Sequence, residues 1–392
     1  MSAPPVYLDY AATAPVRPEV LEAMLPYLGQ GAFGNPSSAH RFGRLARAGL
    51  EQARREVAEA VGAEPNQVVF TSGGTEADNL AVLGACLAAR DEGRPMHAAV
   101  CATEHKAVLA AAHAVTHLGG EETILPVDSA GLLDLDALDR TLTRRPAVVS
   151  VMWVNNEIGV IQPAGEIAGR CRAAQVVFHT DAVQAFGKIA LTVREIPAAM
   201  VTLSGHKIGG PKGIGALIVR DRKAVEAIIH GGGQQFGIRP GTENVPGAIA
   251  LGRATQLAAA EQAHEAGRLS LLRDQLAARL CAAVPDLTIT GLNAPRAPHI
   301  LHVMVPGADG EALLMHLDLA GVAASGGSAC ATGAVEPSHV LTAMGVARDL
   351  ALGALRFSLG RGSEAADIAR AAEVFPSVVG KVRKLAEALG RG

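Results

Sequence analysis

The feature that most constrains the fold is the alternation of short apolar runs with helical patterns between about residues 16 and 240. A short apolar run bounded by turn residues is typical of a buried strand, whereas a helical period of apolar residues is typical of an amphipathic helix. Strands that alternate with helices predict a largely parallel sheet with helices packed on it. We therefore expect an α/β fold for this part of the chain.

The expected elements can be placed along the sequence. Strands are expected at 67–71, 98–102, 147–154, 176–180, 200–203 and 214–219, and helices at 75–90, 106–118 and 166–174. Residues 247–284 contain no proline and are rich in Ala, Leu, Glu and Arg, which predicts one helix or a pair of helices connecting two domains. The chain from residue 285 onwards mixes strands with helices and is expected to form a smaller α+β domain.

Composition argues against several classes of protein. Hydrophobic residues make up 49% of the 392 residues and charged residues 19%, as in a globular protein with a large core. The net charge of −3 gives no basic surface for nucleic acid, and no apolar run reaches the roughly 18 residues of a membrane span. The N-terminus lacks a signal-peptide pattern, and the five cysteines are unevenly spread. These features favour a cytoplasmic protein without a disulfide framework.

Polar residues follow several of the expected strands, where ligands bind in α/β sheets. The turn "SGGT" at 72–75 opens a helix whose N-terminal amides would bind an anion such as phosphate. His105, Asp181 and Lys207 each lie just after a strand. Taken alone, each has a plainer interpretation: a capped glycine turn, a capping histidine, an aspartate paired with an arginine and a lysine in solvent.

Together these residues predict a site for pyridoxal phosphate. Such a site needs a lysine for the Schiff base, an acid against the pyridinium nitrogen and a cup for the phosphate. Lys207 in "SGHKIGGPKG", Asp181 in "FHTDAVQ" and the turn at 72–75 supply these three parts, and His105 is a candidate to face the ring.

The chain resembles the cysteine desulfurases of the NifS/IscS type, which are fold-type I pyridoxal phosphate enzymes of the class-V aminotransferase family. The resemblance runs nearly from end to end, in the family's order. Its motifs are "YLDYAATAPV", "FGNPSSAHRFGR", "FTSGGTEADNLA", "TEHKAV", "VNNEIGVIQP", "DAVQAFGK", "SGHKIGGPKGIGAL", "HGGGQQFGIRPGTENV", "SGGSACATGAVEPSHVL" and "LRFSLGR".

The resemblance implies a role for each site residue. Lys207 would bind the cofactor covalently, His105 would stack on its ring and move protons, and Asp181 would pair with its nitrogen. The remaining assignments are Gln184 for the ring hydroxyl, Gly74, Thr75, Ser204 and His206 for the phosphate, Thr242 for the phosphate of the neighbouring subunit's cofactor, and Asn156 and Arg356 for the substrate. An arginine in the strand-like "ALRFSLG" is otherwise expected to pair with a structural acid.

The resemblance also implies a division into domains. A large cofactor-binding α/β domain would span 16–259, with a mostly parallel seven-stranded sheet flanked by helices. A small α+β domain would combine 1–15 with 260–392 and carry a mobile catalytic loop at about 325–335.

Cysteine usage points independently to Cys330. The other four cysteines (86, 101, 171 and 281) lie in helix or strand patterns and are expected to be small buried hydrophobes. Cys330 lies in "ASGGSACATGA", which is typical of a loop where a thiol can react. In the family this cysteine takes the sulfur of L-cysteine as a persulfide, releases L-alanine and passes the sulfur to an acceptor protein.

The expected partners are L-cysteine, a second copy of the chain in a homodimer, and a sulfur acceptor for iron–sulfur cluster assembly or tRNA thiolation. No intrinsic metal site is expected, and transient binding of an iron–sulfur cluster by Cys330 stays open. The chain ends at Gly392 without the extension by which the housekeeping IscS type docks its scaffold, so nitrogenase-linked, housekeeping and tRNA-thiolation roles stay open. Activity on selenocysteine also stays open, and an aminotransferase or a selenocysteine lyase would share Lys207 and Asp181 without needing Cys330.

Overall fold

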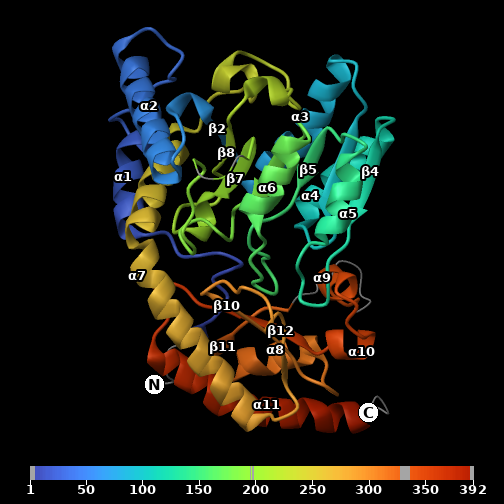
Figure 1. Cartoon of the computed structure of the whole chain (residues 1–392). Helices are drawn as coiled ribbons and strands as arrows, with labels where there is room; N and C mark the ends of the chain where they lie inside the picture. Colours follow the sequence, from blue (N-terminus) through green and yellow to red (C-terminus); the bar gives the residue numbers. More distant parts are fainter. Residues whose placement is uncertain (1–4, 195, 197, 327–335, 389–392) are drawn as a thin grey trace.

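A computed structural model describes residues 5–194, 196, 198–326 and 336–388. Figure 1 shows two bodies of unequal size, one above the other, joined along one side by the long helix α7 (Val245–Ala283). The upper body is built on a seven-stranded sheet, and the lower body on smaller sheets.

The seven-stranded sheet has the order β2-β8-β7-β6-β5-β3-β4. All neighbouring strands run parallel except at β8, which is antiparallel to both β7 and β2. The strands are β2 (Val68–Thr71), β3 (His97–Cys101), β4 (Glu121–Leu125), β5 (Val148–Ser150), β6 (Val177–Asp181), β7 (Met200–Ser204) and β8 (Gly215–Val219). The expected mostly parallel sheet of an α/β fold is confirmed.

The direction of β2 matters for the site. Because β2 and β7 are both antiparallel to β8, they run the same way. The carboxyl ends of β2, β3, β5, β6 and β7 therefore meet at one edge of the sheet. The polar residues that follow these strands are brought to that edge.

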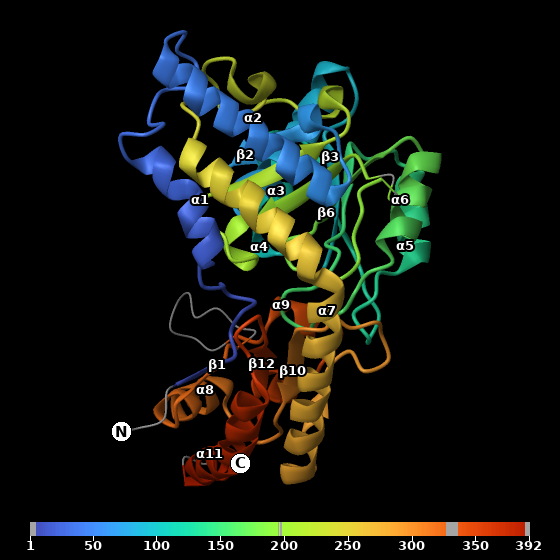
Figure 2. The ribbon, with the colours of Figure 1, turned by 90° about the vertical axis from the view of Figure 1, so that its left-hand side faces the viewer.

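Side chains alternate between the two faces of each strand, and the strand residues on both faces are mostly apolar. Helices therefore cover both faces of this sheet. In β3, Ala98 and Val100 pack with α3 and α4, while Ala99 and Cys101 face the core that includes α2, α6 and the start of α7. Figures 1 and 2 show α1, α2 and α7 side by side. The helices are α1 (Pro18–Leu28), α2 (Arg41–Val61), α3 (Gly74–Asp91), α4 (Lys106–His117), α5 (Leu135–Leu142) and α6 (Ala164–Ala173), with 3₁₀ turns η1 (Pro65–Gln67), η2 (Gly205–Lys207), η3 (Arg222–Ala224) and η4 (Gln234–Gly237).

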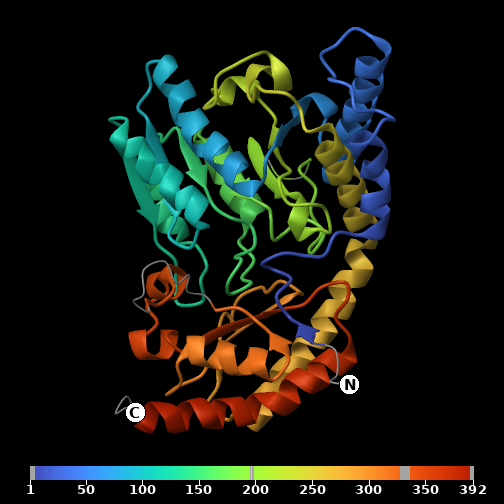
Figure 3. The ribbon, with the colours of Figure 1, turned by 180° about the vertical axis from the view of Figure 1, so that it is seen from behind.

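The lower body joins the two ends of the chain. A three-stranded antiparallel sheet has the order β12-β10-β9, and β1, near the N-terminus, pairs in parallel with β11. Figure 3 shows α8 and α11 on one side of these strands. The elements are β1 (Val6–Tyr7), β9 (Thr288–Ile289), β10 (Ile300–Met304), β11 (Val322–Ala323), β12 (Ala354–Ser358), α8 (Gly310–Leu319), α9 (His339–Ala343), α10 (Arg348–Ala351) and α11 (Ala365–Ala388).

Helix α7 belongs to both bodies. Its first turns, including Leu251 and Ala254, pack in the core of the large sheet, whereas Leu269, Leu276 and Leu280 pack in the core of the lower body. The sequence left open one helix or two, and the structure has a single helix of 39 residues. We propose that the two bodies are a large domain over 16–259 and a small domain formed by 1–15 and 260–392, since the packing of α7 changes core between Ala258 and Leu269.

Four elements of the upper body were not expected from the sequence, namely α1, α2, β4 and α5. Strand β4 is an edge strand, and α5 has eight residues. The strand expected at 147–154 is shorter, because β5 ends at Ser150 and only an isolated bridge from Val154 to Ile161 follows. In the part of the chain that the structure describes, no helix is long and apolar enough to cross a membrane.

Candidate active site

Lys207 lies in the turn that follows β7, at the edge of the sheet where the parallel strands end. Its Nζ donates hydrogen bonds to the carbonyl oxygens of Ala11 at 2.6 Å and Ala12 at 2.8 Å. Burial, and after it the charge of Arg356, lower the pKa of Lys207 to about 8, a shift that Asp181 and Asp9 partly oppose. An amine with this pKa is far more often neutral at pH 7 than an ordinary lysine, which suits it to react with an aldehyde or to accept a proton.

The glycines around Lys207 allow the chain to turn sharply. Gly209 has a φ of +83°, and a Cβ there would lie 2.5 Å from Cγ of Arg17. Gly205 and Gly210 are joined by a backbone hydrogen bond of 2.8 Å. The segment that the sequence marked as a tight turn therefore needs glycine to hold Lys207 in place.

Asp181 ends β6 and is buried. One carboxylate oxygen accepts a hydrogen bond from the backbone N–H of Val183 at 2.8 Å. Burial raises the pKa of Asp181, while the Val183 hydrogen bond, His105 and Lys207 lower it. A cationic partner would favour its charged form further.

Gln184 lies one turn beyond Asp181 and is also buried. Its Nε2 donates to the carbonyl oxygen of Ala11 at 2.9 Å, and its Oε1 contacts Nε2 of His299 at 3.1 Å. Both ends of the Gln184 amide therefore have protein partners. The expected contact of Gln184 with a ring hydroxyl stays a prediction.

His105 caps helix α4, in agreement with its plainer interpretation. Its Nδ1 accepts a hydrogen bond from the backbone N–H of Ala107 at 3.1 Å. Burial lowers the pKa of His105, Asp181 opposes the shift, and Lys207 lowers the pKa further, so the neutral ring is favoured. In the neutral ring the proton is then on Nε2, which leaves the ring to stack or to pass a proton.

The turn after β2 has the features of an anion site. Gly73 precedes α3, and no side chain caps that helix end. A Cβ on Gly74 would lie 3.2 Å from Cγ2 of Val183 and 3.7 Å from Cβ of Ser204, so the turn meets the strand that leads to Lys207. Uncapped N–H groups at the start of an 18-residue helix favour an anion such as phosphate.

The other residues expected to hold phosphate lie in the same two turns. His206 contacts Oγ1 of Thr13 through Nδ1 at 3.1 Å, and burial lowers the pKa of His206 to about 4. Thr75 is exposed at the first turn of α3. A neutral His206 acts on an anion as a hydrogen-bond partner and not as a charge.

Arg356 reaches the site from β12 of the lower body. It donates to Oδ1 of Asp9 at 2.8 Å and to the carbonyl oxygen of Asn156 at 2.8 Å, while its buried Nε has no hydrogen-bond partner among the described residues. The sequence left open two partners for Arg356, a structural acid and a substrate carboxylate. Asp9 is the structural acid. Arg356 is oriented by a structural acid and still has donors that suit a carboxylate.

Two buried carboxyl groups behind Asp181 were missed by the sequence. Glu104 accepts a hydrogen bond from the backbone N–H of Met152, and its second oxygen has no partner among the described residues. Asp78 on α3 lies 3.7 Å from Nε2 of His179. Burial, with Asp181 as a second cause, raises the pKa of both groups well above the usual values. These shifts favour the neutral acids at Asp78 and Glu104, which keeps further negative charge away from Asp181.

Thr242 lies apart from these turns, and Cys330 is not among the residues that the structure describes. Thr242 is exposed and lines a cavity of about 200 Å³ beside Ser72, on the surface next to the anion site.

Of the cysteines other than Cys330, those at positions 86, 101 and 171 are buried, and burial raises the pKa of each to about 12, which leaves them unreactive. Within the described ranges, no group of three or more His, Cys, Asp or Glu residues could hold a metal ion.

The residues at this edge of the sheet fit pyridoxal phosphate. Lys207 supplies an amine with a lowered pKa for the aldehyde, and Asp181 supplies a buried carboxylate that a pyridinium would stabilise. The uncapped start of α3 supplies donors for the phosphate. The neutral ring of His105 is in electrostatic contact with both Asp181 and Lys207.

Comparisons with known proteins agree with this geometry. A family model described as Aminotransferase class-V matches residues 6–371. The chain is 42% identical over 380 residues to the cysteine desulfurase IscS of Dictyoglomus turgidum, covering 97% of this chain and 96% of that relative. The solved structure of a NifS-like protein has a TM-score of 0.86 at 32% identity, and the match covers 98% of this chain and 99% of that one. Another solved structure, SspA in complex with cysteine, has a TM-score of 0.78 at 32% identity, with 90% of this chain and 98% of that one covered.

Proposed function

Since the chain belongs to the class-V aminotransferase family, we propose how its residues perform the reaction of a pyridoxal-phosphate-dependent cysteine desulfurase. The protein is such an enzyme, and it removes sulfur from L-cysteine. The observation that carries the residue assignment is the meeting of Lys207, Asp181 and His105 at one sheet edge, with Arg356 reaching it from the lower body.

The cofactor is pyridoxal phosphate, which residues of the large domain would bind. Lys207 would hold it covalently, and Asp181 would favour a protonated ring nitrogen. His105 and Asn156 would contact the ring, and Gln184 would meet its hydroxyl group. Gly74, Thr75, Ser204 and His206 would hold the phosphate. When bound, the cofactor supplies an electron sink for charge that develops at the substrate Cα.

The substrate is oriented by its carboxylate. Arg356 has donors left after its hydrogen bonds to Asp9 and Asn156, and a guanidinium binds a carboxylate in a fixed plane. Asn156 adds a polar contact to the bound substrate. Lys207 then accepts the Cα proton, because its low pKa makes it a base near neutral pH. His105 assists this transfer of protons.

Sulfur leaves by attack of Cys330. The Cys330 thiolate attacks the sulfur of the substrate, the Cβ–S bond breaks, and its electron pair stays on carbon, where protons complete L-alanine. The products are L-alanine and a persulfide on Cys330. The solved relative SspA is in complex with cysteine, which supports L-cysteine as the substrate here.

The enzyme works as a homodimer in which Thr242 completes the phosphate cup of the partner subunit. Thr242 is exposed beside the anion site of its own chain, which suits a residue that acts across an interface. Large apolar side chains are exposed on α1 and around the start of α2. These are Leu21, Leu25, Leu28, Phe33, Phe42 and Leu45. A second copy that covers them would bury this surface.

The sulfur is passed to an acceptor protein for iron–sulfur cluster assembly or tRNA thiolation, and the enzyme works in the cytoplasm. The location is supported by the cysteines, since the four that the structure describes are free thiols. The IscS relatives support the role in cluster assembly.

The test is turnover of L-cysteine with alanine and sulfide measured together in the presence of a thiol reductant. The native enzyme is expected to form the two products in equal amounts. Cys330→Ala is expected to keep the cofactor absorption and lose both products, while the matched control Cys281→Ala keeps both. Alanine formation by Cys330→Ala at near the native rate would instead indicate a lyase that needs no persulfide.

A further inference from the structure

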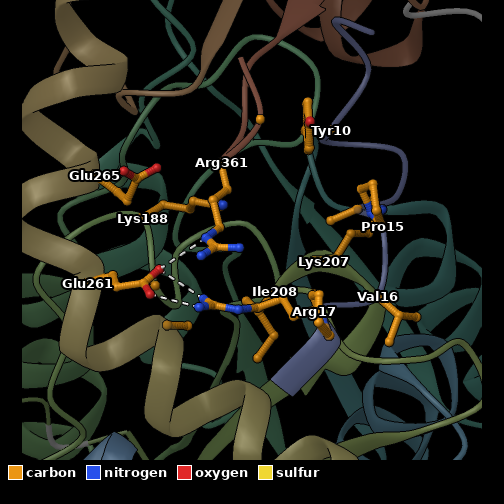
Figure 4. A pocket seen from close by; sticks show the side chains of 16 residues that line it. Tyr10, Pro15, Val16, Arg17, Lys188, Lys207, Ile208, Glu261, Glu265 and Arg361 are labelled. Atoms are coloured by element: carbon orange, nitrogen blue, oxygen red, sulfur yellow. Dashed lines mark hydrogen bonds and ion pairs between the residues drawn. The ribbon is translucent and has the colours of Figure 1, made fainter. Parts of the chain in front are cut away.

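A cavity of about 530 Å³ lies between the two bodies, on the side of α1 and α7. Its lining joins Lys207 and Ile208 of the large domain to Tyr10 and Arg361 beside the small sheets. Figure 4 shows Glu261, Glu265, Lys188 and Arg361 on one side of the cavity and Tyr10, Pro15 and Val16 on the other. Apart from Lys207, the mechanism above uses none of the residues that line this cavity.

Most of the charges that face the cavity are already paired. Arg17 donates to both oxygens of Glu261 at 2.9 and 2.7 Å. Glu265 accepts from Arg268 at 2.9 and 2.7 Å. Arg361 forms only long ion pairs, at 3.8 Å from both Glu19 and Glu261. Glu261 and Glu265 on α7 therefore each have an arginine as their direct partner.

Lys188 is the cavity-lining cation that has no directly bonded partner among the described residues. Its side chain is half-buried and lines the cavity, and its Nζ makes no hydrogen bond or ion pair with the residues that the structure describes. Burial lowers the pKa of Lys188, which Glu265 partly opposes. Glu265 therefore acts on this ammonium without a direct contact, and a half-buried ammonium is stabilised further by an anion that binds it directly.

We propose that this cavity is a binding site for a small aliphatic monocarboxylate, with the carboxylate on Lys188 and Arg361. The volume is in the range of small-molecule sites, and such sites combine apolar walls with a few polar groups that orient the ligand. The apolar wall is formed by Ala14, Pro15, Val16, Pro18, Ile208 and Ala258.

The charges favour one negative charge over two. Arg361 carries a planar fork that matches a carboxylate, and Lys188 adds a point charge. Glu261 and Glu265 lie on the same side, so a second negative charge on the ligand would be repelled. A phosphate dianion is therefore disfavoured. The proposal does not depend on the desulfurase reaction.

The test uses propionate as the probe, because it has no amine with which to react at the cofactor. Binding to the holoenzyme is followed by ligand-observed NMR in four proteins: native, Lys188→Met, Lys188→Arg and Arg356→Gln. Propionate is expected to bind the native, Lys188→Arg and Arg356→Gln proteins with similar affinity. Lys188→Met, which keeps an unbranched side chain one heavy atom shorter and removes the charge, is expected to bind about tenfold or more weakly.

The other outcomes would overturn the proposal. Loss of all binding in Arg356→Gln would place propionate in the substrate site instead. Equal binding by Lys188→Met and the native protein, or no binding by the native protein, would show that Lys188 does not form a carboxylate site. Cofactor absorption and turnover of Lys188→Met are measured alongside, and both are expected to match the native enzyme, which shows that the fold and the active site are intact.

Discussion

Single residues at the site owe their chemistry to burial. Lys207, Asp181 and His105 lie close enough to affect one another's charge, and burial is the largest cause of each pKa shift. The result is a lysine that loses its proton easily, a neutral histidine and an aspartate in need of a cation. Each state is the one that pyridoxal phosphate chemistry requires.

The lowered pKa of Lys207 predicts how cofactor capture depends on pH. With a pKa of about 8, the neutral fraction of Lys207 rises about tenfold per pH unit below pH 8 and levels off above it. The rate at which cofactor-free protein rebinds pyridoxal phosphate, followed by absorbance, is expected to show the same plateau. Arg356→Gln is expected to move the plateau to higher pH, because Arg356 is one cause of the lowered pKa. A native rate that keeps rising to pH 10 would contradict the assignment.

The sequence could predict the catalytic side chains but not the groups that orient them. Lys207 and Asp181 stand at strand ends, where the sequence itself marks them. Ala11 and Ala12 orient Lys207 through their backbone carbonyl oxygens. Every residue type has this group, so the sequence does not reveal the contact. Asp9 pairs with Arg356 across 347 positions in the chain, and only the fold reveals such a pair.

Elements place these residues through direction and length. The sheet brings the carboxyl ends of six strands to one edge, those of β2, β3, β5, β6 and β7 among them. Helix α7 fixes the lower body below that edge by contributing to both cores. Strongly apolar strands such as β7 and β8 were predicted to within a residue or so, because they are buried on both faces. Strand β4 was missed because it is an edge strand with an exposed, mixed pattern.

The second half of α7 is expected to stabilise the small domain through its buried leucines. Leu276 is fully buried, whereas Leu271 on the same helix is 68% exposed. Leu276→Ala is expected to lower the free energy of unfolding by about 2–5 kcal/mol, because it leaves a cavity in the core. Leu271→Ala is expected to change it by about 0.5 kcal/mol or less. Urea denaturation of the two variants checks this, and equal destabilisation would contradict the packing described for α7.

At the scale of the whole molecule, the exposed apolar surface favours the proposed dimer. The large apolar side chains on α1 and the start of α2 are unusual for a surface left in water. Composition alone could not locate this patch, because an apolar residue on a helix is interpreted from sequence as core. The fold shows which face of α1 packs on α7 and which face is left exposed.

The dimer can be disrupted at that patch. Leu25→Glu places a charge among these residues and is expected to shift the protein towards monomer at micromolar concentration, as measured by sedimentation velocity. The monomer is expected to lose cofactor faster, because Thr242 of the partner subunit is gone. Leu319→Glu is the control, since Leu319 is also a leucine, is more exposed than Leu25 and lies on α8 of the lower body. A Leu25→Glu protein that stays dimeric would show that the interface lies elsewhere.

The central claim is that sulfur moves from L-cysteine to Cys330 while Lys207 and its neighbours process the carbon skeleton. Its most direct test is mass spectrometry of the enzyme after a single turnover of L-cysteine without reductant. We predict that the peptide containing Cys330 gains the mass of one sulfur atom, with one alanine formed per subunit and no gain on Cys86, Cys101, Cys171 or Cys281. Alanine formed without added sulfur on Cys330, or sulfur found on one of the other four cysteines, would contradict it.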